Sequence, residues 1–556
     1  MADTKREIER KYEATGETRV PDLTGHGGVH DVTDRGVTEL DAVYYDTTGL
    51  RLAADGITLR RRTGGGDEGW HLKFPVATGI RDEIHAPLAD ALPRALHALL
   101  RSRVRDDALV PVVRLLSSRK VSHLADAQGE LLAELSVDSV RAERLGDGGG
   151  TASWTEIEVE LADDTDPAVL DALDKRLRKA GIRRSSAASK LARALEETSE
   201  PPGTRTEPAQ APPPVPVADS AEVLESTRAA DTAPRRRGKG HTAPKAPQAA
   251  ETVRDRGARL KRKHAGEYVL AYLREQRDAI IALDPAVRRD LPDAVHQMRV
   301  ATRRMRSGFK TYRKIIDRAV TDPVGDELKW LAGELGVARD QEVLAERLLA
   351  RIEALPRPLL LGPVRGRLRT WGTAHRSDAR RRSVAVLDGK RYLGLLDTLD
   401  ALLDEPPLLK AATADPATAL PKAVIRDYER LAHRVERALG LPAGHERDLA
   451  MHDARKAAKR ARYAAEAATP ALGKPARKLA RRMKSVQTVL GDHQDSVVAR
   501  GTLRDLAIQA HAAGEPSFTW GLLHGHEEAL AARRERELPG VWAKASRPGL
   551  RASLSK

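Results

Sequence analysis

Residues 7–13 read EIERKYE, and this stretch decides between two folds for the first part of the chain. Every second residue from Glu7 to Glu13 is charged, so a strand would place these side chains on one face. In an ordinary half-buried strand that face would meet water, with Ile8 and Tyr12 turned toward a core. The same face would line an enclosed interior if helices covered the apolar side instead.

Seven further segments alternate in the same way and are separated by Gly/Asp turns such as GGGDEG and GDGGG. Two helical stretches, LPRALHALLRS and DPAVLDALDKRLRKAG, intervene. This pattern predicts an α+β domain built on an antiparallel meander or barrel. The seven segments are LDAVYYDT, ITLRRRT, GWHLKF, RDEIHAPL, VVRLLSSRKVSHL, LLAELSVDSV and WTEIEVEL.

The charges on these segments allow two interpretations. If they all face outward, the alternating apolar residues form the core of an ordinary small barrel. If they face inward, counter-ions must lie among them, because burying like-signed charges alone is very costly. A divalent metal beside Glu/Asp and a polyphosphate beside Lys/Arg would supply both signs, and a barrel of about eight strands has room for one small ligand. Periodicity permits the second interpretation without requiring it.

Residues 1–197 resemble the CYTH domain, a branch of the triphosphate tunnel metalloenzymes. A lone ExExK motif is weak evidence, but its N-terminal position, followed in order by the other charged segments, makes the match specific. The matching elements are the ExExK motif at residues 7–11, YYDT at 44–47, LRRR at 59–62, WHLK at 70–73, Arg119, Glu134, Asp138, EIEVEL at 156–161 and Ser189-Lys190.

The resemblance implies a closed antiparallel barrel whose tunnel binds a triphosphate and a divalent metal, Mg or Mn. Carried over to this sequence, the implied metal ligands are Glu7, Glu9, Glu134, Asp138, Glu156, Glu158 and Glu160. The implied phosphate-binding residues are Lys11, Arg60, Arg62, Lys73, Arg119 and Lys190. Among these, the residues expected to carry catalysis are Glu7, Glu9, Lys11 and Glu158.

Composition limits the remaining functions. The 556 residues contain no cysteine, which excludes a disulfide framework, a catalytic thiol and Cys-ligated zinc. Residues 1–200 hold 29 Lys and Arg against 36 Asp and Glu, whereas the rest of the chain holds 66 against 44. The basic surface therefore lies in the second part, and polyanions are its first candidate partners. No run of about 18 uncharged apolar residues is present, so we expect a cytoplasmic protein without a membrane partner.

Residues 198–254 are expected to be a disordered linker. Ten of the 32 prolines fall in residues 201–250, where large apolar residues are few. Such a segment cannot bury enough surface to offset its ordering entropy. A basic cluster at residues 235–239 could add electrostatic binding, although a solvated charge run is an equally good interpretation.

After the linker the hydrophobic period changes to that of amphipathic helices, which predicts an all-α domain at residues 255–545. The domain is also repeated. VHQMRVATRRMR at 295–306 recurs as MHDARKAAKRAR at 451–462, an offset of 156 residues. LKWLAGELGVARD and MKSVQTVLGDHQD match at an offset of 155, which indicates a duplicated helical unit.

Each repeat carries one basic stripe, since residues three and four apart share a helix face. The doubled H-x-x-R-x-x-x-[RK]-R pattern resembles the CHAD domain, the conserved histidine α-helical domain. The resemblance implies two pseudo-symmetric four-helix bundles that bind inorganic polyphosphate and associate with polyphosphate granules. The implied polyphosphate-binding residues are His296, Arg299, Arg303, Arg306, Lys329, His452, Arg455, Lys459, Arg462 and Lys484.

Several alternatives stay open at this point. A basic stripe does not distinguish one phosphate polymer from another, so DNA remains an alternative to polyphosphate, although an aromatic content of 3% disfavours single-stranded nucleic acid. A metal site on the stripes is disfavoured, because neither helix places a second histidine at i+4. We expect a metal-dependent hydrolase of inorganic triphosphate or polyphosphate. The alternatives are a non-catalytic polyphosphate-binding granule protein and a thiamine or nucleoside triphosphatase.

Overall fold

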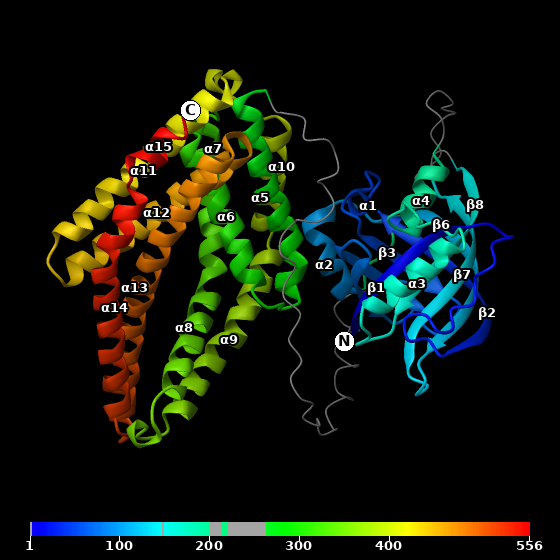
Figure 1. Cartoon of the computed structure of the whole chain (residues 1–556), viewed down its shortest axis with the longest axis horizontal. Helices are drawn as coiled ribbons and strands as arrows, with labels where there is room; N and C mark the ends of the chain where they lie inside the picture. Colours follow the sequence, from blue (N-terminus) through cyan, green and yellow to red (C-terminus); the bar gives the residue numbers. More distant parts are fainter. Residues whose placement is uncertain (1–2, 147–148, 200–212, 219–262, 556) are drawn as a thin grey trace. The chain divides into compact units, whose positions relative to one another are not determined.

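The computed structural model describes residues 3–146, 149–199, 213–218 and 263–555. Within them the chain forms two compact units, one built on strands and the other on the helices from residue 265 onward (Figure 1). Most of the expected linker at 198–254, including its basic cluster at 235–239, lies outside the described residues.

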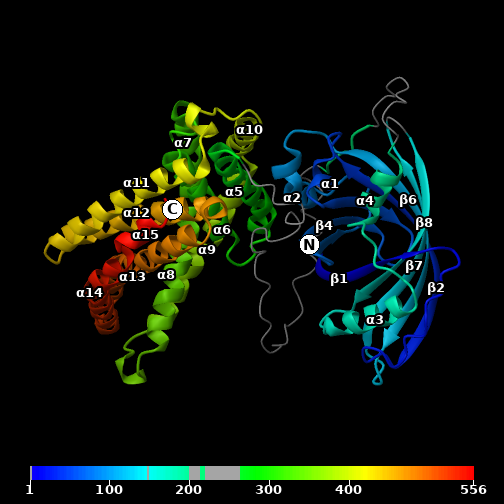
Figure 2. The same cartoon turned by 45° about the horizontal axis from the view of Figure 1, so that its top comes forward.

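The first unit is a closed barrel in which neighbouring strands are antiparallel. The strand order is β1-β5-β4-β3-β2-β6-β7-β8, and β8 pairs with β1 to close the circle (Figure 2). The segments predicted as strands all form strands, so the predicted barrel is confirmed. The strands are β1 (Asp3–Ala14), β2 (Asp31–Asp46), β3 (Thr58–Thr63), β4 (Gly69–Ala77), β5 (Ile80–Ala86), β6 (Val110–Ala125), β7 (Leu131–Arg144) and β8 (Thr151–Leu161).

The strand register gathers the charged side chains on the inner face of the barrel. Residues directly opposite each other in an antiparallel pair point to the same face. Lys11 on β1 lies opposite Glu158 on β8, Glu156 on β8 lies opposite Asp138 on β7, and Asp138 lies opposite Arg119 on β6. Asp138 and Glu156 are buried, although both are ionisable. The interpretation of EIERKYE as an inward-facing charged strand is therefore correct.

Helices cover parts of the outer face of the barrel, where the alternating apolar residues lie. α2 (Arg94–Val104) packs against Leu59 and Leu72, and α3 (Ala168–Lys179) packs against Ile157. These apolar side chains are fully buried. Both helices were predicted from the sequence, and they provide the cover that allows the charged side chains to face inward.

A third helix, α4 (Lys190–Glu197), packs inside the barrel wall. Its Leu191 and Ala194 contact Val140 and Trp154, which are paired across β7 and β8 and share the inner face with the charged residues. Asp138 lies on the same inner face of β7, two residues before Val140. The apolar contacts of α4 therefore border directly on the charged region. The sequence does not predict this helix, because eight residues are too few to display a helical period.

The YYDT motif at residues 44–47 holds the turn after β2. Asp46 is fully buried, and its carboxylate accepts hydrogen bonds from the backbone N–H groups of Thr47 (2.7 Å), Leu52 (2.9 Å) and Ala53 (2.8 Å). These bonds tie the end of β2 to α1 (Arg51–Ala54). The aspartate of the motif is therefore structural.

The second unit is helical, as predicted. Its described helices fall into two groups that follow the duplicated sequence, with α10 (Lys390–Asp404) between them and α15 (Pro548–Ala552) at the end. The first group contains α5 (Ala265–Arg288), α6 (Ala294–Thr311), α7 (Arg318–Glu334) with α8 (Gly336–Glu353), and α9 (Val364–Asp388). The second group contains α11 (Pro416–Gly440), α12 (His445–Leu472), α13 (Lys474–Ala512) and α14 (Phe518–Ala545).

The two groups correspond helix by helix. α7 begins at Arg318 and α13 begins 156 positions later at Lys474, which is the offset found between the basic segments. The groups differ at one place, because the helix of the first repeat is interrupted at Leu335 whereas α13 continues without a break. The stripe-bearing helices α6 and α12 pack against each other.

A short piece of the expected linker is attached to the barrel unit. Val215 donates its N–H to Leu109 O (2.8 Å), and Leu92 donates its N–H to Pro216 O (2.7 Å). Residues 213–218 thus extend along the chain segments on either side of α2. These backbone hydrogen bonds connect residues 213–218 to the barrel unit, and the linker at 198–254 stays a prediction.

We expect Asp46→Ala to destabilise the barrel, because it leaves three buried N–H groups without an acceptor. Leaving buried donors unpaired should lower the free energy of unfolding by about 3 kcal/mol. Asp46→Asn keeps an acceptor oxygen and should cost less. Scanning calorimetry of the full chain measures both effects, and an unchanged barrel transition in Asp46→Ala would contradict the structural role.

Candidate functional site

Three carboxylates meet inside the barrel and form what we call the carboxylate cluster: Asp138 on β7 with Glu156 and Glu158 on β8. Each offers one oxygen, and these three oxygens lie within 4.8 Å of one another. All three residues are buried. The indole Nε1 of Trp154 donates to Glu156 Oε2 (2.7 Å), which leaves Glu156 Oε1 facing the cluster.

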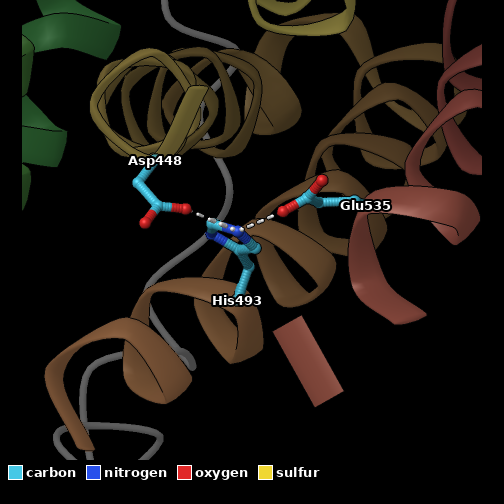
Figure 3. Close-up of side chains that lie close together, drawn as sticks. All are labelled: Asp448, His493 and Glu535. Atoms are coloured by element: carbon cyan, nitrogen blue, oxygen red, sulfur yellow. Dashed lines mark hydrogen bonds and ion pairs between the residues drawn. The ribbon is translucent and has the colours of Figure 1, made fainter. Parts of the chain in front are cut away.

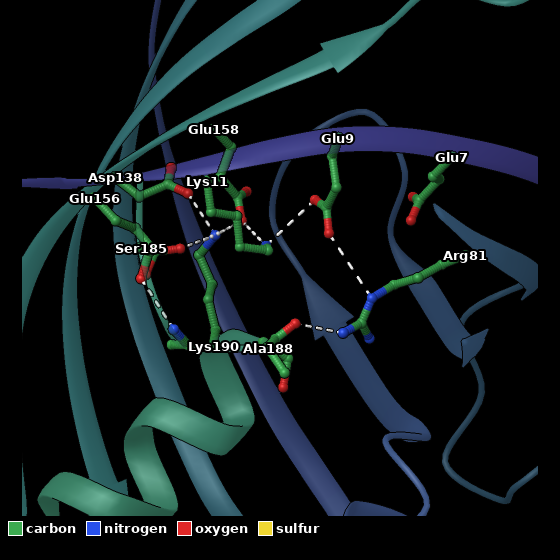
Figure 4. A network of polar contacts seen from close by, with 12 residues as sticks. Glu7, Glu9, Lys11, Arg81, Asp138, Glu156, Glu158, Ser185, Ala188 and Lys190 are labelled. Carbon is green, nitrogen blue, oxygen red and sulfur yellow. Dashed lines mark hydrogen bonds and ion pairs between the residues drawn. The ribbon is translucent and has the colours of Figure 1, made fainter. Parts of the chain in front are cut away.

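Cationic side chains balance the carboxylate cluster (Figure 4). The ammonium of Lys190 lies 2.9 Å from Asp138, 2.8 Å from Glu156 and 2.6 Å from Glu158. Arg119 donates to both oxygens of Asp138 at 2.7 Å and to Glu158 at 3.0 Å. Lys11 also forms an ion pair with Glu158. The interior therefore holds acids and bases together, as the inward-facing interpretation required.

This electrostatic balance keeps the carboxylates ionised. Burial opposes the ionisation of Glu158, but Lys11, Lys190 and Arg119 outweigh it and hold its pKa well below the usual value. Burial likewise opposes the ionisation of Asp138, and Lys190 and Arg119 again lower its pKa. Both groups are therefore anionic at neutral pH.

The donor set of the carboxylate cluster fits a hard divalent cation. Mg²⁺ and Mn²⁺ prefer carboxylate oxygens, and three converging carboxylates satisfy that preference. Glu156 Oε1 accepts no hydrogen bond, although Lys190 forms an ion pair with it. Asp138, Glu156 and Glu158 are therefore the residues that would hold the metal.

Other expected metal ligands lie outside this cluster. Glu9 is 3.2 Å from Lys11 and 3.8 Å from Arg81. Glu160 pairs with Lys5, and the side chain of Glu134 is 39% exposed, so both lie toward a rim of the barrel. Their role as metal ligands stays a prediction.

Glu7 belongs to a second charged group on β1, β4 and β5. Both of its oxygens accept hydrogen bonds from Lys73 at 2.7 Å. Lys73 also lies 3.4 Å from Glu83, which in turn contacts His71 Nδ1 at 2.8 Å. Burial raises the pKa of Glu7 to about 8. Glu7 is consequently a carboxyl group that can exchange a proton near neutral pH.

A third group, on β3, is dominated by positive charge. Arg60 donates to the hydroxyl of Tyr44 (3.3 Å), and Arg62 pairs with Asp67. The Nε atoms of both arginines are buried and have no hydrogen-bond acceptor. Burial and the neighbouring Arg60 lower the pKa of Arg62 to about 10. An anion between these guanidinium groups would satisfy both the charge and the donors.

Arg81, Glu83 and Trp154 also belong to this site, although they are not among the residues predicted from the sequence. Arg81 and Glu83 lie in RDEIHA, which alternates as EIERKYE does, so the same pattern could have identified them. Trp154 carried no comparable signal. In the sequence, tryptophan is counted as an apolar residue. Only the structure shows that its Nε1 donates a hydrogen bond to Glu156.

The basic stripes lie on α6 and α12, whose packing brings residues of both repeats together. Burial, together with Arg455, Arg303 and Arg299, lowers the pKa of Lys459 to about 7. Arg299 and Arg303 lie on α6, whereas Arg455 and Lys459 lie on α12. The predicted stripes therefore form one cationic surface.

The other predicted stripe residues lie on α6, on α12 or on helices packed against them. His296 is exposed on α6, and His452 contacts Gln494 through Nδ1 (2.7 Å). Lys329 on α7 and Lys484 on α13 are exposed, and their helices pack against α6 and α12. Arg306 lies on α6, and Arg462 pairs with Glu466 at 3.3 Å. Their part in binding stays a prediction.

A second acidic group in the helical unit is already neutralised. His493 Nε2 lies 3.3 Å from Asp448 Oδ1 and 3.3 Å from Glu535 Oε1 (Figure 3). The remaining carboxylate oxygens accept from Arg500 (2.9 Å) and Arg447 (2.8 Å). This cluster joins α12, α13 and α14, and its charges balance without a metal.

Among the described residues, no helix combines the length and the apolar character needed to cross a bilayer.

Two family models match the chain, one over each unit. The CYTH domain matches residues 5–195 and the CHAD domain matches residues 271–504. Two uncharacterized proteins of Mycobacterium tuberculosis, MT2285 of strain CDC 1551 and Rv2226 of strain H37Rv, are each 37% identical to this chain. The alignments cover 97% of this chain and 96% of theirs.

Solved structures also resemble the chain. PptA from Streptomyces chartreusis is 21% identical, with a TM-score of 0.42, over 50% of this chain and 99% of that chain. The CHAD domain from the plant Ricinus communis is 27% identical, with a TM-score of 0.41, over 57% of this chain and 97% of that chain. The family models, in this order along the chain, identify it as a member of the family in which a CYTH domain is followed by a CHAD domain.

Proposed function

We propose that the barrel hydrolyses phosphoanhydride bonds of inorganic triphosphate or polyphosphate with the help of Mg or Mn. The observation that supports this proposal is that one closed barrel contains both an acidic site and a basic site. One site is the carboxylate cluster, and the other contains Arg60 and Arg62, whose buried Nε atoms have no acceptor. A metal would occupy the first site, and phosphate oxygens would accept hydrogen bonds at the second.

The cations divide the work of binding the substrate. Arg60, Arg62 and Lys73 would bind phosphate oxygens at one side of the tunnel, since charge-assisted hydrogen bonds to oxyanions are strong. Arg119 and Lys190 form ion pairs with the carboxylate cluster. With a metal bound to these carboxylates, both cations would be available to donate hydrogen bonds to phosphate oxygens. Fixed cations of this kind stabilise the charge that develops in phosphoryl transfer.

The reaction needs no nucleophile from the protein. A bound divalent metal supplies Lewis acidity, which neutralises charge on the transferring phosphoryl group. Glu7 can hold or release a proton near neutral pH, because burial raises its pKa to about 8. Glu9 and Lys11 continue the same inward face between Glu7 and the carboxylate cluster.

We further propose that the helical unit binds inorganic polyphosphate and that the protein associates with polyphosphate granules. The cationic surface supports this, because Lys459 lies among three arginines that repel its charge. An extended polyanion would relieve that repulsion along the whole stripe. Duplex DNA offers the same kind of charge, so competition between the two polymers at equal phosphate concentration distinguishes them.

One observation favours a second candidate, a polyphosphate-binding protein without turnover. The Lys190 ammonium lies within hydrogen-bonding distance of all three carboxylates, in the space that a metal would take. Phosphate release from tripolyphosphate, thiamine triphosphate and ATP, with Mg and with Mn, separates the binding protein from the enzyme. The same assay selects among the inorganic, thiamine and nucleoside substrates.

Glu158→Gln should reduce Mg- or Mn-dependent phosphate release from tripolyphosphate by about 100-fold or more, because it removes a ligand from the carboxylate cluster. Chelation with EDTA should abolish the release by the wild-type protein, and added Mn should restore it. The matched control is Glu143→Gln, an exposed position on β7. Wild-type turnover in Glu158→Gln would refute the assignment.

Glu7→Gln should alter the pH profile of this release. The carboxyl group with a raised pKa is protonated below pH 8 and ionised above it, so its loss should flatten the profile between about pH 7 and 9. Initial rates in buffers of constant ionic strength measure the effect. A profile identical to that of the wild type would exclude Glu7 as the titrating group.

Polyphosphate binding should take up a proton at Lys459. The lowered pKa leaves this side chain largely neutral above pH 7, and a bound polyanion favours the charged form. Affinity should therefore fall as the pH rises through 7. Calorimetric titration in EDTA at pH 7.5, in two buffers of different ionisation enthalpy, measures the uptake.

Lys459→Arg should lose this proton uptake, because arginine stays charged at this pH. The control is Lys456→Arg on the same helix, where the side chain is 60% exposed. Any protons exchanged by the terminal phosphates of the polymer contribute equally in the wild type, Lys459→Arg and Lys456→Arg. The difference in proton uptake between these proteins therefore measures the contribution of Lys459. Equal uptake by all three would contradict the prediction.

A further inference from the structure

Each repeat places a glycine against the first arginine of its basic stripe. Gly336 lies at the start of α8, and a Cβ atom on it would be 2.9 Å from Nη2 and 3.1 Å from Cζ of Arg299. Gly491 lies in α13, and a Cβ atom there would be 3.6 Å from Nη2 of Arg455. The two glycines correspond in the duplicated sequence, so both repeats leave a space for a guanidinium group at the same place.

The space is tighter in the first repeat than in the second. Carbon atoms rarely approach side-chain atoms to within 3.1 Å, whereas 3.6 Å is an ordinary contact. Both guanidinium groups have polar partners. Arg299 donates through Nη1 to the carbonyl oxygen of Gly336 (3.3 Å), whereas Arg455 forms an ion pair with Asp495 (3.3 Å). The carbonyl oxygen of Gly336 therefore helps to hold the guanidinium group for which the absence of a Cβ atom leaves room.

We propose that Gly336 is a positioning residue of the polyanion-binding surface, because it seats the guanidinium group of Arg299 among the cations of both repeats. This inference rests on the proposed binding of polyphosphate by the helical unit. A methyl group at position 336 would displace the far end of Arg299, which is flexible, rather than the helix backbone. The change should therefore leave the fold intact but alter the position of the Arg299 charge.

The arrangement matters because Arg299 acts together with Lys459 and Arg303. All three lie close enough for their charges to interact. Neighbouring phosphates of a linear polyanion are held at fixed spacing by covalent bonds, so a cation that shifts along the surface loses its match with the chain. Gly336 would thus affect affinity for a polyphosphate more than affinity for single phosphate ions.

The test compares four glycine-to-alanine variants of the full chain in EDTA, using polyphosphate of defined length as the probe. Gly336→Ala should weaken binding about tenfold, the equivalent of one charge-assisted contact. Gly491→Ala should weaken it by less than about threefold, because its contact is longer. The controls are Gly333→Ala in α7 and Gly501→Ala in α13, where nothing lies within 4 Å of the added Cβ atom, and both should bind as the wild type does.

Two further measurements separate positioning from a general loss of structure. Thermal unfolding should show Gly336→Ala as stable as Gly333→Ala. Arg299→Lys should weaken binding by itself, and adding Gly336→Ala to it should cause no further loss, since the two changes act through one guanidinium group. Inorganic phosphate, used as a second probe, should bind the wild type and Gly336→Ala alike.

The outcomes distinguish this inference from the function on which it rests. Wild-type affinity in Gly336→Ala, with binding still weakened by Arg299→Lys, would overturn the role of Gly336 alone. Additive losses in the double variant would also overturn it. No binding by the wild type, or no effect of Arg299→Lys, would overturn the proposed polyphosphate site and the inference with it.

Discussion

The barrel depends on the balance of positive and negative charge in its interior, where removing a charge from water costs much free energy. Asp138, Glu156 and Glu158 are buried next to Lys11, Arg119 and Lys190, and each carboxylate contacts at least one cation. Removing one partner of a buried ion pair typically costs about 3–5 kcal/mol, because the remaining charge is uncompensated. The acids and bases of the interior must therefore be kept together, and the strand register that aligns them is constrained as strongly as a hydrophobic core.

Much of this barrel could be predicted from alternation alone. Each strand segment shows a period of two, and the outward residues such as Leu59 and Ile157 are apolar. Alternation does not say which face is inside, because Glu158 inside and Ile157 outside give the same pattern as the reverse. The resemblance to a known family supplied that direction, and the helices α2 and α3 provide its physical reason.

The candidate site could be predicted only in part. Register follows from strand pairing, so residues on one face, such as Asp138 and Glu156, could be grouped before their contacts were known. The interior is divided into three groups: the carboxylate cluster, a group around Lys73 and a group around Arg60. This division depends on how side chains from distant strands meet, which the sequence does not give. The contact of Arg299 with Gly336 is likewise beyond sequence reasoning, because the repeat aligns Gly336 with Gly491 but does not give the distance from either glycine to an arginine.

The position of α4 has a consequence for any linear substrate. Along β7 the inner face runs from the exposed Glu134, through the buried Asp138, to Val140, which Leu191 of α4 covers. On this side of the barrel, α4 fills the inner face with apolar side chains. Under the proposed hydrolysis, a linear phosphate would meet this apolar packing beyond Asp138, so a chain terminus would enter and leave on the charged side. Cleavage would then trim chains stepwise and leave no mid-length fragments.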